Sequence, residues 1–320
     1  MTQNEGTHLA ANEHAGEAAF ERRLAAVAQA VEERIAALFE DNPRRGEIAR
    51  PARLVAAMRH AMLGGGKRLR PFLVIETAAL FGVPFTQALN GACALELVHG
   101  YSLVHDDLPA MDDDDLRRGQ PTVHKAFDEA TAILAGDALL TMAFDVVADE
   151  STHPDPAIRI SFVQGLARAA GLGGMVGGQM LDLAAEGRYG EVLMDEARIR
   201  RLQAMKTGAL IAYSVEAGAL IGHASLEDRQ ALGNFGRAIG AAFQVADDLL
   251  DRESNAAAMG KRVAKDAEKG KATLVDVLGI ERARMECDSL VDKAMNALER
   301  FGEKADTLRA AARFTVTRKS

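Results

Sequence analysis

The stretch 86–107, TQALNGACALELVHGYSLVHDD, is the part of the sequence that says most about the fold. It has helix-forming composition and is apolar on every side of an expected helix, which is typical of a helix buried in a protein core. Three of its few polar residues, His99, Ser102 and Asp106, fall within about 60° of one another at 100° per residue. A polar stripe on a buried helix usually faces a cavity or a partner. We therefore expect a central helix with one functional face.

The regions on either side of this helix are also helical in pattern. The chain has 320 residues, of which 48% are hydrophobic, and it lacks runs of alternating polar and β-branched residues. We expect an all-α fold with helices at 195–222 and 225–250 and a polar loop at 252–271. The 225–250 helix should bury a stripe at steps of three and four: Leu232, Phe235, Ile239, Phe243, Ala246 and Leu250.

No Pro/Gly/Ser-rich linker divides the sequence. We expect a disordered tail at 1–15 and a single all-α domain at 16–320. The net charge of −8 argues against a nucleic-acid partner. The first twenty residues contain no apolar signal core, and no run reaches the roughly 18 apolar residues of a spanning helix. Without a CxxC pair, Cys93 and Cys287 are expected to be buried thiols. These features favour a cytoplasmic protein without stable membrane insertion.

Two clusters of aspartates follow apolar helical stretches. The first spans 105–115, HDDLPAMDDDD, and the second spans 247–251, DDLLD. The C-terminal end of a helix carries partial negative charge, so carboxylates there are unfavourable. Two carboxylates 4 Å apart also repel by about 4 kcal/mol at an effective dielectric constant of 20. A divalent cation is the simplest group that offsets this repulsion.

Oxygen-only ligands favour Mg²⁺, with Mn²⁺ as a possible substitute. Asp247 and Asp251 are four residues apart and lie on one helical face. In the first cluster Pro109 breaks the helix, so Asp112 can fold back toward Asp106. A solvated acidic loop is the alternative, and it is weakest for Asp106 and Asp247, which adjoin long apolar runs.

Basic residues accompany both clusters. Lys67 and Arg70 follow three glycines, 64–66, which let the backbone approach an anion that the side chains then clamp. The spacing is not that of a Walker A loop. Arg117 and Arg118 follow the first cluster directly. Any one of these residues alone is more typical of a surface charge. The set of basic residues also includes Lys206, Lys261 and Lys271. Together with the two aspartate clusters, these basic residues indicate two diphosphate sites, one of them bridged by metal.

Six motifs together resemble the trans-isoprenyl (polyprenyl) diphosphate synthase family, and most of all its bacterial farnesyl diphosphate synthases. They are GGGKRLRP at 64–71, HDDLPAMDDDDLRRGQPTVH at 105–124, GQMLDL at 178–183, KTGAL at 206–210, FQVADDLLD at 243–251 and the GK and KDAEKGKAT segments within 260–273. They occur in family order over about two thirds of the chain. The four residues between Asp107 and Asp112 are similar to the bacterial short-chain type.

The resemblance implies an isoprenoid synthase fold of ten or more helices around a central cavity, in a homodimer. It implies Mg²⁺ ligands on two walls, namely Asp106, Asp107 and Asp112, and Asp247, Asp248 and Asp251. The allylic diphosphate would contact Arg117, Lys206, Thr207, Gln244 and Lys261, and isopentenyl diphosphate would contact Lys67, Arg70, His99 and Arg118. Gly66 is a further predicted substrate-binding residue. Lys271 would lie on the segment that closes the site. The predicted catalytic set is Asp106, Asp107, Asp112, Asp247 and Lys206.

The implied reaction joins isopentenyl diphosphate to dimethylallyl or geranyl diphosphate by metal-assisted ionisation, condensation and proton elimination. Ser102 lies nearly beneath Asp106, whereas ideal geometry puts Tyr101 about 140° around the helix axis. In similar enzymes an aromatic at the Tyr101 position limits chain length, so the expected product is farnesyl diphosphate. Geranyl and geranylgeranyl diphosphate remain alternatives. Two other classes of protein fit the sequence less well. A terpene cyclase needs no second diphosphate site. A non-catalytic regulatory subunit is expected to have eroded aspartate clusters, and both clusters are intact here.

Overall fold

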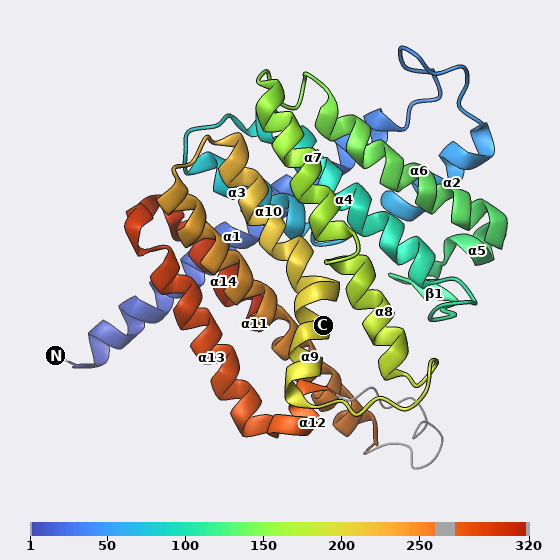
Figure 1. Ribbon diagram of the computed structural model, residues 1–320. Coiled ribbons are helices and arrows are strands. Elements are labelled where there is room, and N and C mark those ends of the chain that lie inside the picture. Colours follow the sequence, from blue (N-terminus) through green and yellow to red (C-terminus); the bar gives the residue numbers. More distant parts are fainter. Residues whose placement is uncertain (1, 260–272, 318–320) are drawn as a thin grey trace. The chain divides into compact units, whose positions relative to one another are not determined.

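The computed structural model describes residues 2–259 and 273–317, with side chains described for 16–252 and 273–317 (Figure 1). The predicted all-α class is confirmed. Within the described residues the only paired strands are β1 (Leu116–Arg117) and β2 (Gln120–Pro121), a short antiparallel hairpin. The chain forms two compact units, Met1–Val163 and Gln164–Ser320. The single domain expected over residues 16–320 stays a prediction.

The first unit is built on α4 (Phe85–Asp106), the helix that the opening stretch predicts. Ala92, Leu95 and Leu97 are completely buried in it. Four helices pack against α4, namely α1 (Thr2–Leu38), α2 (Ala52–Met62), α3 (Leu69–Ala79) and α6 (Glu129–Ala148). The short α5 (Val123–Ala126) follows the hairpin. The prediction of a central, buried helix is therefore confirmed.

Helix α1 begins at Thr2, so most of the tail expected at 1–15 falls within its first turns. Residue 1 and the side chains of 2–15 lie outside the described part, and the expectation of disorder there stays a prediction.

Helix α6 is long and apolar enough to cross a membrane by length and composition, the one such helix among the described residues. The expectation concerned an uninterrupted run of about 18 apolar residues, and α6 does not contain one. Asp137 and Asp145 interrupt its apolar run without lowering the average hydropathy below that of a spanning helix. Helix α6 packs along α4 and buries part of its surface there, as the core helix of a globular protein does.

The second unit is built on α11 (Leu226–Met259), which packs against α10 (Ala209–Ile221), α13 (Ile280–Ala297) and α14 (Asp306–Thr317). The predicted stripe is buried at Leu232, Phe235, Ile239 and Ala246, whereas Phe243 and Leu250 are half-buried. Helix α7 (Pro156–Ala170) joins the units, and the remaining elements are α8 (Met175–Ala185), α9 (Glu196–Gln203), α12 (Leu274–Leu278) and the 3₁₀ segment Glu299–Ala305. Cys93 and Cys287 are free and buried, as predicted.

One predicted helix boundary is wrong, and one predicted helix is interrupted. Helix α11 continues to Met259 instead of ending near 250, so a polar loop does not begin at 252. The sequence 252–259 begins with four polar residues, ends in three alanines and a methionine, and holds no proline or glycine, so nothing in it stops a helix. The helix expected at 195–222 is interrupted by a π-helical turn, Ala204–Gly208, between α9 and α10. The rest of the predicted 252–271 loop lies outside the described residues.

Candidate active site

The first aspartate cluster begins at the last residue of α4, Asp106. After Pro109 the chain turns back, and the amide nitrogen of Asp112 donates to the carbonyl oxygen of Asp106 at 2.8 Å. Asp113, with φ of +56°, completes the turn by donating to Leu108. The expected return of Asp112 toward Asp106 is therefore confirmed at the level of the backbone.

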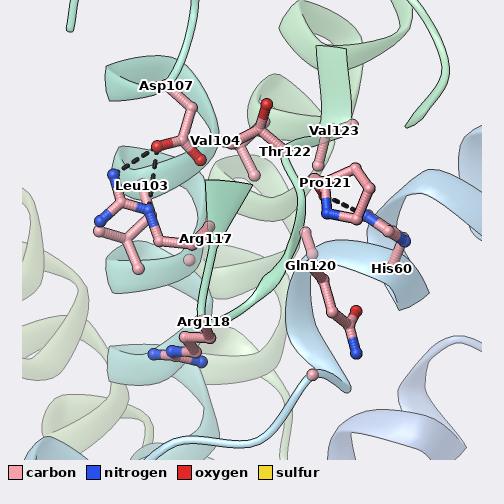
Figure 2. A pocket seen from close by; sticks show the side chains of 13 residues that line it. His60, Leu103, Val104, Asp107, Arg117, Arg118, Gln120, Pro121, Thr122 and Val123 are labelled. Atoms are coloured by element: carbon pink, nitrogen blue, oxygen red, sulfur yellow. Dashed lines mark hydrogen bonds and ion pairs between the residues drawn. The ribbon is translucent and has the colours of Figure 1, made fainter. Parts of the chain in front are cut away.

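Asp107 is the buried member of this cluster, with 3% of its surface exposed. Its Oδ1 atom accepts hydrogen bonds from Arg117 Nε at 2.9 Å and from the Nη2 atom of the same guanidinium (Figure 2). Burial raises the pKa of Asp107, and the hydrogen bond and charge of Arg117 partly offset that rise. The hairpin that carries Arg117 is thereby tied to the end of α4. One oxygen of this predicted metal ligand is thus already used by an arginine.

The glycine loop at 64–66 lies against Arg118. The Nη1 atom of Arg118 donates to the carbonyl oxygen of Gly65. A Cβ atom at Gly66 would lie 2.8 Å from the guanidinium carbon, and φ at Gly66 is +131°, so a larger residue meets both a clash and a strained backbone. These glycines were predicted to let an anion approach the backbone. In the structure they leave room for the guanidinium of Arg118, which the resemblance assigns to the same anion site.

His99 lies among arginines. Burial, followed by the charges of Arg70, Arg118, Arg68 and Arg117, holds the pKa of His99 well below its usual value. His99 is therefore neutral at neutral pH, and it can donate one hydrogen bond without adding to the local positive charge. The charges of Arg70 and Arg118 therefore both act on His99, and the assignment of these residues to an anion site stays a prediction. Lys67 is exposed on the loop beside it.

A pocket opens between α2, α4 and the hairpin (Figure 2). It encloses about 450 Å³, counting space open to solvent. Its polar lining includes Asp107, Arg117, Arg118, Gln120 and His60. A small anion would find two guanidinium groups here, one of them balanced by a carboxylate.

Tyr101 lies one turn before the cluster and is 6% exposed. Its ring meets that of His105 edge to face, with centroids 5.9 Å apart. Burial and the nearby charge of Asp106 raise the pKa of its hydroxyl to about 12. Ser102 is half-buried and donates to the carbonyl oxygen of His99 at 2.8 Å. A role for Tyr101 or Ser102 in chain length stays a prediction.

The second aspartate cluster lies within α11 and not at its end. Asp247 and Asp251 are exposed, whereas Asp248 is half-buried. The Oδ2 atom of Asp248 accepts from Gln203 Nε2 at 2.9 Å and from the amide nitrogen of Leu274, the first residue of α12, at 3.0 Å. Burial raises the pKa of Asp248 to about 6, and the charges of Asp247 and Asp251 act in the same direction. This concentration of oxygen ligands fits a hard divalent cation.

The π-helical turn carries Lys206 and Thr207, and two helices hold it closely. From α8, the carboxylate of Asp182 accepts from Lys206 Nζ at 2.6 Å, and Gly178 is so near that an added Cβ would lie 2.1 Å from the amide nitrogen of Lys206. From α11, a Cβ at Gly240 would lie 3.2 Å from the Cα atom of Gly208. Short π-helical turns occur often at functional sites.

The predicted residues thus fall into two groups, one in each unit. The first unit holds Asp106, Asp107, Asp112, the arginines and His99, and the second holds Lys206, Thr207, Gln244 and the aspartates of α11. Lys261 and Lys271 lie outside the described residues. In the part of the chain that is described, no three His, Cys, Asp or Glu side chains already gather at metal-binding distance.

Four polar residues in these surroundings escaped prediction. Glu96 forms an ion pair with Arg68. Gln203 hydrogen-bonds to Asp248, and Asp182 pairs with Lys206. The Nε2 atom of Gln179 is buried without a hydrogen-bond partner. Gln179 and Asp182 belong to the GQMLDL motif, which signalled the family without assigning them a role. Glu96 could be found as the one charged residue inside the apolar run of α4.

An all-helical fold with two aspartate clusters and a basic, glycine-flanked loop defines the class of enzymes with the isoprenoid synthase fold. Comparison with known families narrows this class. The chain belongs to the polyprenyl synthetase family, whose model matches residues 51–313. The family predicted from the six motifs is thereby confirmed.

Individual relatives cover most of the chain. It is 46% identical over 270 residues to farnesyl diphosphate synthase of Escherichia coli strain K12, which covers 83% of this chain and 89% of that protein. It is 40% identical over 272 residues to a chloroplastic geranylgeranyl pyrophosphate synthase of Catharanthus roseus, covering 85% and 75%. The crystal structure of an FPP/GFPP synthase from Zymomonas mobilis matches with a TM-score of 0.83 at 45% identity, covering 94% of this chain and 100% of that one.

Proposed function

We propose that this protein is a short-chain prenyltransferase that condenses isopentenyl diphosphate with dimethylallyl and then geranyl diphosphate to give farnesyl diphosphate. The observation that carries the proposal is the electropositive region of Arg70, His99 and Arg118 beside the first aspartate cluster. It supports a second diphosphate site that needs no metal. A terpene cyclase, with a single diphosphate to bind, has no use for this region.

The acidic residues fit a divalent cation, which we propose to be Mg²⁺ or Mn²⁺. Asp106 and Asp112 in the first unit, and Asp247 and Asp251 in the second, offer carboxylate oxygens, which suit a hard divalent cation. We propose that Asp107 and Asp248 contribute their remaining oxygen atoms. When bound, the cation would neutralise the charge that develops on a leaving diphosphate.

The protein's own residues would bind and orient the two substrates. Lys67, Arg70 and Arg118 would hold isopentenyl diphosphate by charge-assisted hydrogen bonds, with neutral His99 as a further donor. Arg117, Lys206, Thr207 and Gln244 would hold the allylic diphosphate, and Lys261 and Lys271 would contribute from outside the described residues. The released diphosphate is the proposed acceptor of the proton lost after condensation. The apolar body of α4 would keep water from the reacting carbons.

Product length rests on the sequence relatives and on Tyr101. Among the relatives compared, the farnesyl diphosphate synthase of E. coli is more similar to this chain than the plant geranylgeranyl enzyme. Buried Tyr101, below the first cluster, is the proposed floor for a C15 chain. The C20 product remains the second candidate, because a relative with that name is still 40% identical.

We further propose a cytoplasmic homodimer. Helix α6 leaves Ile133 and Leu134 exposed by 45% and 57%, and adjacent exposed apolar residues of this size favour a protein partner. A second copy is the partner that symmetry makes commonest.

The test is incubation of the purified protein with dimethylallyl diphosphate, isopentenyl diphosphate and Mg²⁺, followed by mass analysis of the products. We expect the C15 diphosphate as the main product. Predominant C10 or C20 product would overturn the farnesyl assignment only. Absence of any condensation product would overturn the enzyme class and favour the regulatory-subunit alternative.

A further inference from the structure

A buried ion pair joins the glycine-flanked loop to α4. Arg68 and Glu96 are 4% and 2% exposed, and Arg68 Nη1 donates to Glu96 Oε1 at 2.6 Å. The other terminal nitrogen of Arg68 donates to the carbonyl oxygen of Met62, at the end of α2. Both terminal nitrogens of the guanidinium are thus bound by the protein. Arg68 is therefore held by both α2 and α4.

The backbone at Arg68 explains why the loop needs an anchor. Arg68 has φ of +49° and ψ of +40°, a left-handed conformation that residues with a Cβ rarely adopt. It follows Gly65 and Gly66, which also have positive φ, and it immediately precedes α3. A loop of this kind has a strained backbone at its end and a flexible one before it. The buried side chain of Arg68 fixes the point at which the loop enters α3.

The anchor lies between the residues of the proposed anion site. Arg68 is flanked in sequence by Lys67 and Arg70, and Glu96 precedes His99 by three residues, on the same side of α4. Fixing Arg68 to Glu96 therefore fixes the loop cations against the His99 turn of α4. The charge of Arg68 also acts on His99, in line with their closeness.

We propose that Arg68 and Glu96 are positioning residues for the isopentenyl diphosphate site: their ion pair sets the position of Lys67 and Arg70 relative to His99. This inference rests on the proposed function, because it presumes that the loop binds isopentenyl diphosphate.

Removing one member of a buried ion pair leaves an uncompensated buried charge and destabilises any protein, whatever the role of the pair. Replacing both members by apolar residues of similar volume is often neutral for stability. The double variant Arg68→Met with Glu96→Leu therefore separates the two roles. It should restore the stability that either single variant loses, and it should not restore the hydrogen bonds that place the loop.

The experiment measures isopentenyl diphosphate binding by titration calorimetry without metal, together with steady-state kinetics and thermal unfolding. For the double variant we expect a melting temperature near that of the wild type. We expect affinity for isopentenyl diphosphate and its KM to worsen by about tenfold or more, the scale of losing one hydrogen bond to a charged group. The KM for the allylic substrate should change little.

Glu76→Gln is the matched control. Glu76 is buried on α3, the helix that the loop enters, but it lies away from the loop. It pairs with Arg23 of α1 at 2.8 Å. This variant should lose stability and keep its affinity for isopentenyl diphosphate.

Normal affinity in a stable double variant would overturn the inference. If the double variant does not fold, Arg68→Lys replaces it, since it keeps the buried charges balanced but lacks the planar fork that bonds Glu96 and Met62 together. Unchanged isopentenyl diphosphate binding in a folded Arg68→Lys variant would equally overturn the inference, and weakened binding with an unchanged KM for the allylic substrate would support it. If the wild-type protein binds no isopentenyl diphosphate, the proposed function itself is overturned. The titration of the wild type alone shows this, so the two failures can be told apart.

Discussion

The carboxylates of the two aspartate clusters differ in whether protein groups bind them or solvent surrounds them. Asp107 is bound by Arg117, and Asp248 is bound by Gln203 and the start of α12. Asp247 and Asp251 are exposed on one face of α11. Residue types and spacing predicted that these side chains belong to a site. They could not separate the carboxylates that organise the protein from those that face solvent, because that division depends on Gln203 and Leu274, which are distant in sequence.

Loss of one carboxylate from either cluster should remove most activity. Asp106→Ala and Asp247→Ala should each lower turnover by at least about 10²-fold, the scale of losing one preorganised electrostatic group. Asp288→Ala, which removes an exposed carboxylate from α13, is the control and should leave turnover unchanged. Rates are measured with saturating substrates and Mg²⁺. Full wild-type activity in EDTA would contradict the metal requirement.

Two lysines should separate the two substrates. Lys67 lies beside the His99 region, whereas Lys206 lies on the π-helical turn of the other unit. Lys67→Ala should therefore raise KM chiefly for isopentenyl diphosphate, and Lys206→Ala should act chiefly on the allylic substrate. Each loss should amount to about tenfold or more. The measurement varies one substrate at a time, and equal effects of both variants on both substrates would count against the assignment.

Asp248 should make metal-free stability depend on pH. Its folded-state pKa of about 6 lies above the ordinary aspartate value of 3.8, so the folded state binds the proton more tightly than the unfolded state does. This contribution is complete below about pH 4 and is lost as pH rises through about 6. It should amount to about 1–2 kcal/mol after allowance for solvent around a half-buried group.

Thermal unfolding in EDTA between pH 4 and 7 checks this contribution. Asp248→Asn keeps an acceptor for Gln203 and Leu274 but cannot titrate. Relative to this variant, the wild type should lose stability as pH rises. Parallel curves for the two proteins would show that Asp248 does not titrate in this range.

At the scale of elements, helices were predictable and their irregularities were not. The apolar run of α4 and the stripe of α11 follow from periodicity alone. The π-helical turn at Ala204–Gly208 could not be predicted, because one extra residue in a turn barely disturbs the apolar pattern of a helix. The packing around the π-helical turn explains its position, because Gly178 and Gly240 let the backbones of α8 and α11 approach it closely.

Closing that approach should disturb the turn. Gly178→Ala would place its Cβ 2.1 Å from the amide nitrogen of Lys206, and backbone atoms there cannot swing aside. Overpacking of this kind costs about 1–3 kcal/mol, and it should also lower turnover by displacing Lys206. Gly173→Ala, whose Cβ would meet nothing within 4 Å, is the matched control. Unfolding and turnover are measured for both, and equal behaviour of the two variants would contradict a close-packed turn.

At the scale of the whole molecule, the sequence predicted the fold class, the family and the identity of most candidate residues. The six motifs carried that information because each is a local pattern. The ion pairs Arg68–Glu96 and Lys206–Asp182 were beyond prediction, because their members are 28 and 24 residues apart and nothing local specifies the contact. The residues proposed to contact the substrates are divided between the two units, so neither unit alone carries the full set.

Product length is the property of the whole molecule that one residue can test. If Tyr101 closes the space below the first cluster, Tyr101→Ala leaves a cavity that a longer prenyl chain can fill, at a cost of about 3–5 kcal/mol in stability. The variant should make C20 or longer products and keep the first condensation. Tyr213→Ala is the control, because Tyr213 is equally buried but belongs to the second unit and packs on Gly165. It should lose similar stability and still make C15. Mass analysis of the products decides, and a Tyr101→Ala enzyme that stops at C15 with normal activity removes Tyr101 as the determinant of length.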